Sequence, residues 1–339
     1  RNFDAMIWLR KYHFILMLFL ANEFHAQDIH FSQFMHNPLH QNPGNTGMFD
    51  GDYRFNFAFR DQWRSVSIPY NTVLLSADRA MIYKNLSVGV VFVHDVAGDG
   101  RFRTIDLQPI VSLNFNLDDE HKHRVRPGVQ LGLNYRELRS DQFSWDSQFG
   151  GHIYDPSLPT NENFQRETKG NFTVNSGIVY EWFDGTRRNV NFGAALFNIN
   201  RQNQGFFGEE IPRSRRLMLH GRGQFAINDK WDVLPAFSFN AQGTHREFLT
   251  GSEMRYIMKE SRGEYIALYI GLFSRIVDAA FVNIGMDYQN WFFGLNYDWN
   301  YSKLVPASRI RGGIELTAQY IFRSFKPKRN IHRICPVYL

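Results

Sequence analysis

The segment from Asn290 to Tyr301, with the sequence NWFFGLNYDWNY, decides the fold class. Large apolar residues alternate in it with small or polar ones. The apolar set is Trp291, Phe293, Leu295, Tyr297, Trp299 and Tyr301, and the residues opposite are Gly294, Asn296, Asp298 and Asn300. A period of two residues predicts a β-strand with one apolar and one polar face.

The same alternation recurs along the chain, most clearly in 52–60, 123–138 and 309–323. No segment of comparable length has the 3.6-residue period of an amphipathic helix. We therefore predict an all-β protein. The fourteen expected strands are 52–60, 71–80, 85–94, 101–117, 123–138, 171–183, 188–200, 213–227, 231–242, 246–258, 263–274, 278–288, 290–301 and 309–323.

Composition restricts the class of protein further. The chain has 339 residues, of which 16% are aromatic and 21% charged, and this aromatic content excludes a disordered chain. The mean hydropathy of −0.39 excludes a bundle of transmembrane helices, each of which needs about 20 mostly apolar residues. A transmembrane β-barrel remains, because only one face of each strand is apolar.

Charge and cysteine content exclude further kinds of site. The 38 basic and 33 acidic residues are interspersed, whereas a nucleic-acid groove has a clustered basic stripe, so we expect no nucleic-acid partner. The single cysteine, Cys335, excludes an intramolecular disulfide framework and a Cys-based zinc site, and we interpret it as an inert thiol.

The connections between the expected strands alternate in length. Short links end near 120, 186, 230 and 290, and longer ones span 61–70, 139–170, 201–212 and 302–308. Outer-membrane barrels have short periplasmic turns and longer external loops, so we predict an antiparallel up-and-down barrel of about fourteen strands. Aromatic residues near strand ends agree with this prediction: Trp231, Trp291, Trp299, Tyr301 and Tyr320. The alternative is a secreted soluble protein of two packed sheets or a propeller.

The first residues have the pattern of an export signal. Arg10 and Lys11 precede an apolar run at 12–21, and a small residue, Ala26, follows. This pattern predicts a secretory signal peptide, with Met6 as the expected initiator. The expected division of the chain is an extension and signal peptide at 1–26, a motif segment at 27–51, the barrel at 52–323 and a basic tail at 324–339.

The motif segment contains two Asn-Pro pairs, Asn37-Pro38 and Asn42-Pro43. Such pairs favour turns, because proline fixes φ and asparagine can bond its own backbone. The segment is therefore expected to be compact. It could plug the periplasmic mouth, pack inside the lumen or simply lead into the first strand.

The order of residues in this part of the chain resembles the PorP/SprF family, outer-membrane proteins of the type IX secretion and gliding machinery of the Bacteroidota. The residues that carry the resemblance are Gln33, Asn37, Pro38, Asn42, Pro43, Gly47, Arg60, Gln62, Trp63, Pro69 and Tyr70. The pair Cys335-Pro336 also matches. The chain departs from the family at Val337-Tyr338-Leu339, where Arg-Phe is common, which puts any role of the last residues in doubt.

The resemblance implies an accessory of the secretion system that anchors or presents secreted substrates at the cell surface. The implied partners are a secreted substrate or adhesin with a C-terminal sorting domain, other type IX or periplasmic components, and outer-membrane lipid. The expected contact is loop 139–170, whose aromatic residues are of the kind enriched at interfaces: Phe143, Trp145, Phe149, Tyr154 and Phe164. Alternatively, this loop packs on itself and caps the barrel.

Patterns of catalysis and metal binding are nearly absent, so we expect no enzyme, cofactor or metal site. The weak candidates for acid–base residues are His94, which is beside Asp95, and His220. His121 and His123 lie beside Asp118, Asp119 and Glu120 and could hold a metal, but a solvated periplasmic turn explains the same residues more simply. The arginines Arg213, Arg215, Arg216 and Arg222 could face the lumen and bind an anion, or lie at a strand end. The alternative function is a channel for small hydrophobic or anionic solutes.

Overall fold

The computed structural model describes residues 28–324 apart from 63, 65–67, 99–100, 140–142, 151–152, 162–166, 207–208, 262, 303–304 and 309. Four of the sequence predictions fall outside the described residues: the signal peptide, the tail beyond Ser324 with Cys335, Trp63 and Phe164.

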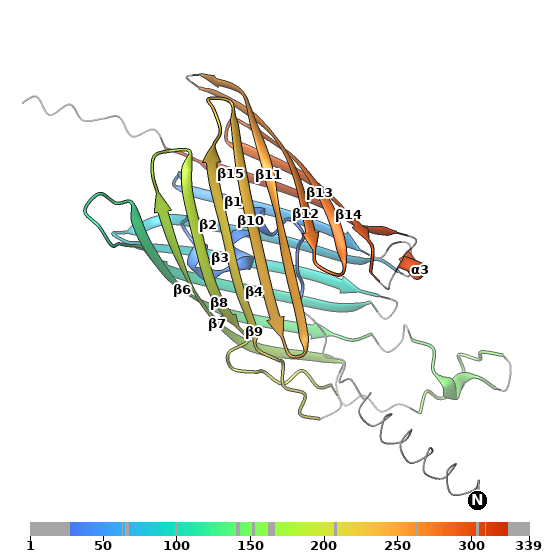
Figure 1. The fold of residues 1–339 in the computed structure, drawn as a ribbon. Helices are drawn as coiled ribbons and strands as arrows, with labels where there is room; N and C mark the ends of the chain where they lie inside the picture. Colours follow the sequence, from blue (N-terminus) through green and yellow to red (C-terminus); the bar gives the residue numbers. More distant parts are fainter. Residues whose placement is uncertain are drawn as a thin grey trace, which may run out of the picture.

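The strands in the described residues form one antiparallel sheet that closes on itself (Figure 1). They are β1 (Tyr53–Gln62), β2 (Tyr70–Tyr83), β3 (Leu86–Ala97), β4 (Phe102–Leu113), β5 (Phe115–Asn116), β6 (His123–Glu137), β7 (Thr168–Phe183), β8 (Arg188–Phe197), β9 (Arg216–Ala226), β10 (Trp231–Gln242), β11 (His245–Ser261), β12 (Glu264–Arg275), β13 (Ala279–Tyr288), β14 (Trp291–Asn300) and β15 (Arg311–Phe322).

Two pairings confirm the predicted barrel of fourteen spanning strands. The first strand pairs with the last, from Tyr53 opposite Phe322 to Asp61 opposite Ile314, and this pairing closes the ring. The short β5 continues β4 past Asn114, and both pair with β6, so β4 and β5 together count as one crossing.

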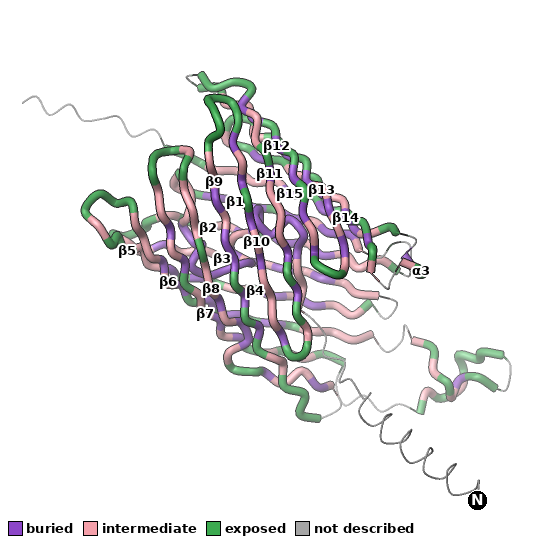
Figure 2. The backbone as a smooth tube through the Cα atoms, in the orientation of Figure 1, coloured by how far each residue is buried: buried purple, intermediate pink, exposed green. Residues whose placement is uncertain are grey.

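The polar face of the sheet is buried and the apolar face is exposed, which is the reverse of a soluble protein. Asn296 is fully buried, whereas the adjacent Leu295 is 46% exposed, and Phe55 on β1 is 49% exposed. Buried and exposed residues alternate in this way along the strands (Figure 2). A soluble sandwich would bury its apolar face, so the exposed apolar band rules out that alternative and is the lipid-facing surface of a transmembrane barrel. No helix among the described residues has the length and apolar character to cross a membrane.

The barrel has two different ends. The turn end carries the tight links at 84–85, 184–187 and 289–290, and the loop end carries the longer connections at 138–167 and 198–215. β9 begins at Arg216 rather than at the predicted residue 213, because Arg213 leaves the sheet to contact Asp28. Short turns face the periplasm and long loops the exterior in this class of barrel.

Residues 28–51, which we call the plug, lie inside the barrel (Figure 1). They contain the short helices η1 (Phe34–His36), α2 (Pro38–Gln41) and η2 (Pro43–Asn45). Each Asn-Pro pair starts one of these turns, because proline fits the first helical position and the Asn42 side chain accepts the N–H of Gly44. Two other short helices lie at the loop end: η4 (Asp146–Gln148) and α3 (Val305–Ser308).

Candidate functional site: the plugged lumen

The plug runs through the lumen from the loop end towards the turn end. Its first described residue, Asp28, contacts Arg213 and Gln242 at the loop end. Near its other end, the backbone N–H of Gly47 donates to Asp78 on β2, in the half of the barrel nearer the turns. β1 then returns the chain to the loop end. Of the predicted alternatives for the motif segment, packing inside the lumen is the observed one.

Asp28 is held by two arginines at the loop end. Its Oδ1 accepts bonds from Nε and Nη2 of Arg213, at 2.9 and 2.6 Å, and from the amide of Gln242 at 2.9 Å. Arg216 lies 3.6 Å away. Burial by itself would raise the pKa of the Asp28 carboxyl, but these cations and hydrogen bonds hold the pKa well below its usual value. Arg213 and Arg216, two of the arginines predicted to face the lumen, therefore bind the Asp28 carboxylate of the same chain.

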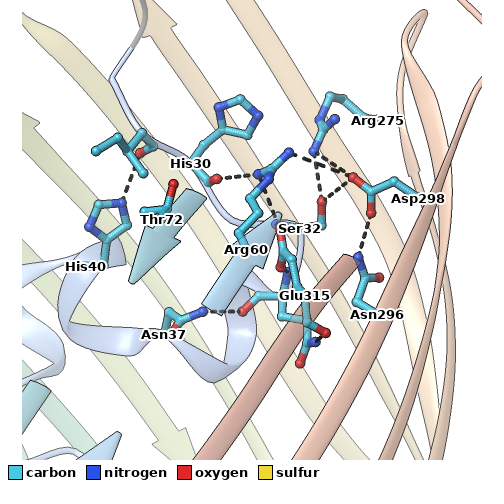
Figure 3. Close-up of polar contacts among 12 residues, drawn as sticks. His30, Ser32, Asn37, His40, Arg60, Thr72, Arg275, Asn296, Asp298 and Glu315 are labelled. Atoms are coloured by element: carbon cyan, nitrogen blue, oxygen red, sulfur yellow. Dashed lines mark hydrogen bonds and ion pairs between the residues drawn. The ribbon is translucent and has the colours of Figure 1, made fainter. Parts of the chain in front are cut away.

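A second polar cluster surrounds Ser32 (Figure 3) and includes the backbone of Gln33. The carboxylate of Glu315 on β15 accepts the backbone N–H groups of both residues, at 2.6 and 2.8 Å, and lies 3.2 Å from Arg60 on β1. The Ser32 hydroxyl donates to Asp298 on β14 at 2.7 Å. It accepts a hydrogen bond from Arg275 on β12. The remaining member of the cluster is Asn296. The motif residues Gln33 and Arg60 therefore meet at one carboxylate.

The middle of the plug contacts well-separated strands of the barrel wall. Asn37 accepts a 2.8 Å bond from Asn56 on β1. The His36 ring lies 3.2 Å from Glu253 on β11 and stacks on Phe292 at 4.1 Å between ring centroids. Because β1 and β11 are five positions apart in the ring, two adjacent plug residues are tied to different parts of the wall.

Asn42-Pro43 packs directly on the backbone of the barrel wall. The Asn42 amide donates to the carbonyls of Ile178 and Ala194, at 3.2 and 3.1 Å, and lies 3.1 Å from His220. A Cβ on Gly128 of β6 would lie 2.5 Å from the carbonyl carbon of Pro43. Only glycine allows this approach of two backbones.

Nearer the turn end, Arg54 and Arg126 surround Gly47. Arg54 makes a two-pronged bond to Asp78, at 2.9 and 2.8 Å, and the same carboxylate accepts the Gly47 N–H at 2.7 Å. Arg126 pairs with Glu181 and donates to the Gly47 carbonyl at 3.3 Å. Both polar groups of Gly47 are thereby satisfied inside the barrel.

The plug divides the lumen unequally. On its loop side the two described cavities measure about 20 and 30 Å³, enough for one or two water molecules. On its turn side there are adjoining cavities of about 640 and 430 Å³. In the described part of the chain the barrel is therefore filled towards its loops and hollow towards its turns.

The remaining motif residues lie where β1 and β2 meet the loop end. Gln62 is opposite Tyr70 in the register of the two strands. The Tyr70 ring would be 3.2 Å from a Cβ on Gly98, so it packs on the neighbouring connection. Pro69 directly precedes β2. These residues form a group separate from the plug contacts.

The predicted contact loop folds on itself and extends past the barrel end (Figure 1). The rings of Phe143 and Trp145 are 5.5 Å apart, as are those of Phe149 and Tyr154. Buried Gln148 donates to the Leu158 carbonyl within the loop. Phe149 is half exposed. The loop therefore has internal structure and also presents aromatic surface.

The weak candidates for acid–base or metal-binding residues make ordinary structural contacts. His94 and Asp95 are neighbours in β3 and so point to opposite faces of the sheet, and Asp95 accepts the Thr72 hydroxyl at 2.6 Å. His220 contacts the plug through Asn42. In the acidic turn, the Asp118 carboxylate accepts the backbone N–H groups of Lys122 and His123.

Comparison with known families identifies the chain. The family model described as "Type IX secretion system membrane protein PorP/SprF" matches residues 23–320. The chain belongs to the PorP/SprF family. Membership agrees with the fold, so the protein is an outer-membrane β-barrel of the type IX secretion system, which implies association with that machinery.

A solved structure of low sequence identity shares the barrel fold. The Pseudomonas putida toluene transporter TodX is 11% identical, with 87% of this chain and 95% of that chain covered and a TM-score of 0.50. The monoaromatic hydrocarbon channel CymD is 10% identical, with 85% and 93% covered and a TM-score of 0.49. A comparison with curated protein sequences finds no match.

Sequence reasoning missed the wall residues that receive the plug, notably Asp78, Asp298, Glu315 and Gly128. Their signal was present but weak: each lies at a lumen-facing position of a predicted strand. Alternation predicts which face such a residue occupies, but it does not predict which plug residue lies opposite.

Proposed function

We propose that this PorP/SprF protein anchors or presents secreted substrates or adhesins at the cell surface by protein–protein recognition. The observation that supports this proposal is the plug, which fills the loop side of the lumen and is tied to the wall by buried ion pairs. A barrel filled in this way has its loops as the surface available to a partner outside the cell. In the proposal, the motif segment 27–51 contains the plug and 52–323 is the barrel. The motif residues from Gln33 to Arg60 are the docking sequence of the plug.

The proposed contact is loop 139–170. Phe149, Ile153 and Tyr154 are exposed large apolar residues on this loop, at 50%, 77% and 40%. Aromatic side chains among polar neighbours are typical of the centres of protein interfaces, where few residues carry most of the binding energy. The proposed partner is the folded C-terminal sorting domain of a secreted protein.

Retention of substrate on intact cells tests this role. We expect the double variant Phe149→Ser/Tyr154→Ser, and deletion of 141–168, to release substrate into the medium. Ile211→Ser is the matched control, because Ile211 is also exposed, at 49%, but lies on another loop. Full retention in both loop variants, with normal amounts of barrel in the membrane, would eliminate the capture role of this loop.

The alternative function is a channel for small hydrophobic or anionic solutes. It requires the plug to move, because the plug lies across the lumen and is tied to the wall by buried ion pairs. Conductance in planar bilayers separates the two functions: a steady conductance of the intact chain favours the channel, and a closed barrel favours the anchor.

A further inference from the structure

The hollow half of the lumen, which we call the vestibule, is a cavity of about 640 Å³ at the turn end. Plug residues such as His36 and Met48 form its inner wall, and β6 to β9 form one side. Its volume is within the range of about 300–1,000 Å³ found for ligand pockets. Neither the proposed capture of substrates outside the cell nor the docking of the plug uses this space.

Two arginines of the vestibule make no ion pair with a described carboxylate, although Arg222 interacts with Glu253 and Asp287 at longer range. Among the described residues, no carboxylate lies within 4.0 Å of the guanidinium of Arg124 or Arg222, whereas Arg54, Arg126 and Arg255 each pair with one. The Nε of Arg124 is buried without a hydrogen-bond partner. A buried donor without a partner costs free energy, so these groups are suited to an anionic ligand.

The two arginines lie on one row across the inner wall. In the register of β6 to β9, Arg124 is opposite Glu181, Glu181 opposite Asn191, and Asn191 opposite Arg222. Three strand spacings of about 4.8 Å separate the arginines by about 14 Å along the wall. Glu181 lies between them, but it pairs with Arg126 and not with either outer arginine. The guanidinium of Arg124 lies over the Phe183 ring, 4.9 Å from its centroid.

We propose that the vestibule binds an acidic peptide segment of a partner protein, in extended conformation, from the turn end. An extended chain rises about 3.3 Å per residue, so carboxylates four residues apart are about 13 Å apart and point the same way. This spacing matches the row from Arg124 to Arg222, and a single phosphate or carboxylate cannot span it. Phe49, Phe183 and Phe292 line the same cavity and provide apolar contacts for the side chains of the peptide.

The partner approaches from the periplasm, since the turn end carries the short links of the barrel. The site is therefore separate from the loop that we propose for capture of substrates. Failure of either proposal leaves the other standing, because the two sites lie at opposite ends of the plug.

Binding of defined peptides to the full chain in detergent tests the proposal. The probe is a labelled seven-residue peptide with aspartates at positions two and six, measured by fluorescence anisotropy. The control peptides carry asparagine at both positions, or the two aspartates side by side. We expect Arg124→Gln and Arg222→Gln each to weaken binding of the probe by about tenfold or more, as loss of a charged hydrogen bond predicts. Arg215→Gln, at the exposed loop end, should leave binding unchanged.

Replacement of Arg222 removes no ion pair in the described chain, so this variant is expected to fold, which circular dichroism checks. Three outcomes would overturn the proposal. They are no binding of the probe by the natural chain, binding in both variants that is as tight as in the natural chain, and complete competition by equimolar inorganic phosphate with no preference for aspartate spacing. The last would indicate a site for small anions instead.

Discussion

Arg213 donates two hydrogen bonds, at 2.9 and 2.6 Å, to a single oxygen of Asp28. This contact joins the start of the plug to the loop that precedes β9, two segments 185 residues apart in sequence. It places the first described residue at the loop end, although β1 begins at the turn end. The plug therefore spans the lumen before the first strand of the barrel starts.

Removal of the Asp28 charge should loosen the start of the plug. Asp28→Asn leaves Arg213 and Arg216 without their carboxylate, and hydrogen bonds to charged groups contribute about 1.5–3 kcal/mol each. We expect amide hydrogen exchange in 28–34 to become about tenfold faster or more, with unchanged exchange in the strands. Asp155→Asn, in the exposed loop, is the control. Identical exchange in both variants would show that this contact does not hold the plug.

Weakening the Glu315 cluster should open the barrel. Glu315→Gln leaves buried Arg60 without its nearest anion, and breaking a buried pair costs about 3–5 kcal/mol. Barrels of this width have room for a solvent path once their contents leave. We expect brief conductance steps in planar bilayers for Glu315→Gln and a steady conductance after deletion of 28–50.

The exposed Glu120→Gln is the control for these recordings and should behave as the natural chain does. A deletion variant that folds and stays as closed as the natural chain would mean that something other than the plug blocks the lumen.

Adding one methyl group to the wall should displace the middle of the plug. In Gly128→Ala the new Cβ would lie 2.5 Å from the carbonyl carbon of Pro43 and 2.7 Å from the nitrogen of Gly44, so backbone must move. Such overpacking costs about 1–3 kcal/mol. Gly170→Ala is the matched control, because nothing lies within 4 Å of its Cβ position. We expect proteolysis of the plug to be faster only in Gly128→Ala, and equal rates would contradict the close approach.

Acid should destabilise the docked plug through His40. Burial and the nearby Arg216 lower the pKa of His40 to about 4 from an ordinary value of 6.5. Above pH 6.5 the ring is neutral in both folded and unfolded chains. Between 6.5 and 4 the unfolded chain takes up a proton that the folded one does not, so stability falls as the pH falls.

The urea midpoint measured at pH 7.5 and 5 checks this prediction. We expect a lower midpoint at pH 5, and a smaller difference between the two values in His40→Gln. A pH dependence of the same size in the variant would assign the effect to other groups.

Strand positions were largely predictable because each strand of this barrel carries its own signal. A residue such as Phe55 faces lipid and its neighbour Asn56 faces the lumen, so period-two alternation is present in every crossing. Strand ends were less predictable. Arg213 belongs to a plausible strand by its sequence, and leaves it because Asp28, far away in the chain, supplies a carboxylate.

Local sequence determined that the chain is an all-β membrane barrel with a compact turn-rich segment before its first strand, because alternation and Asn-Pro turns depend on neighbours in the chain. Only the tertiary structure decided where that segment lies and what it touches. The contacts of Asp28, Asn42 and Gly47 join residues separated by 31 to 185 positions, and no local pattern encodes such pairings. The same holds for the vestibule, whose arginines become a site only when four strands align them on one row.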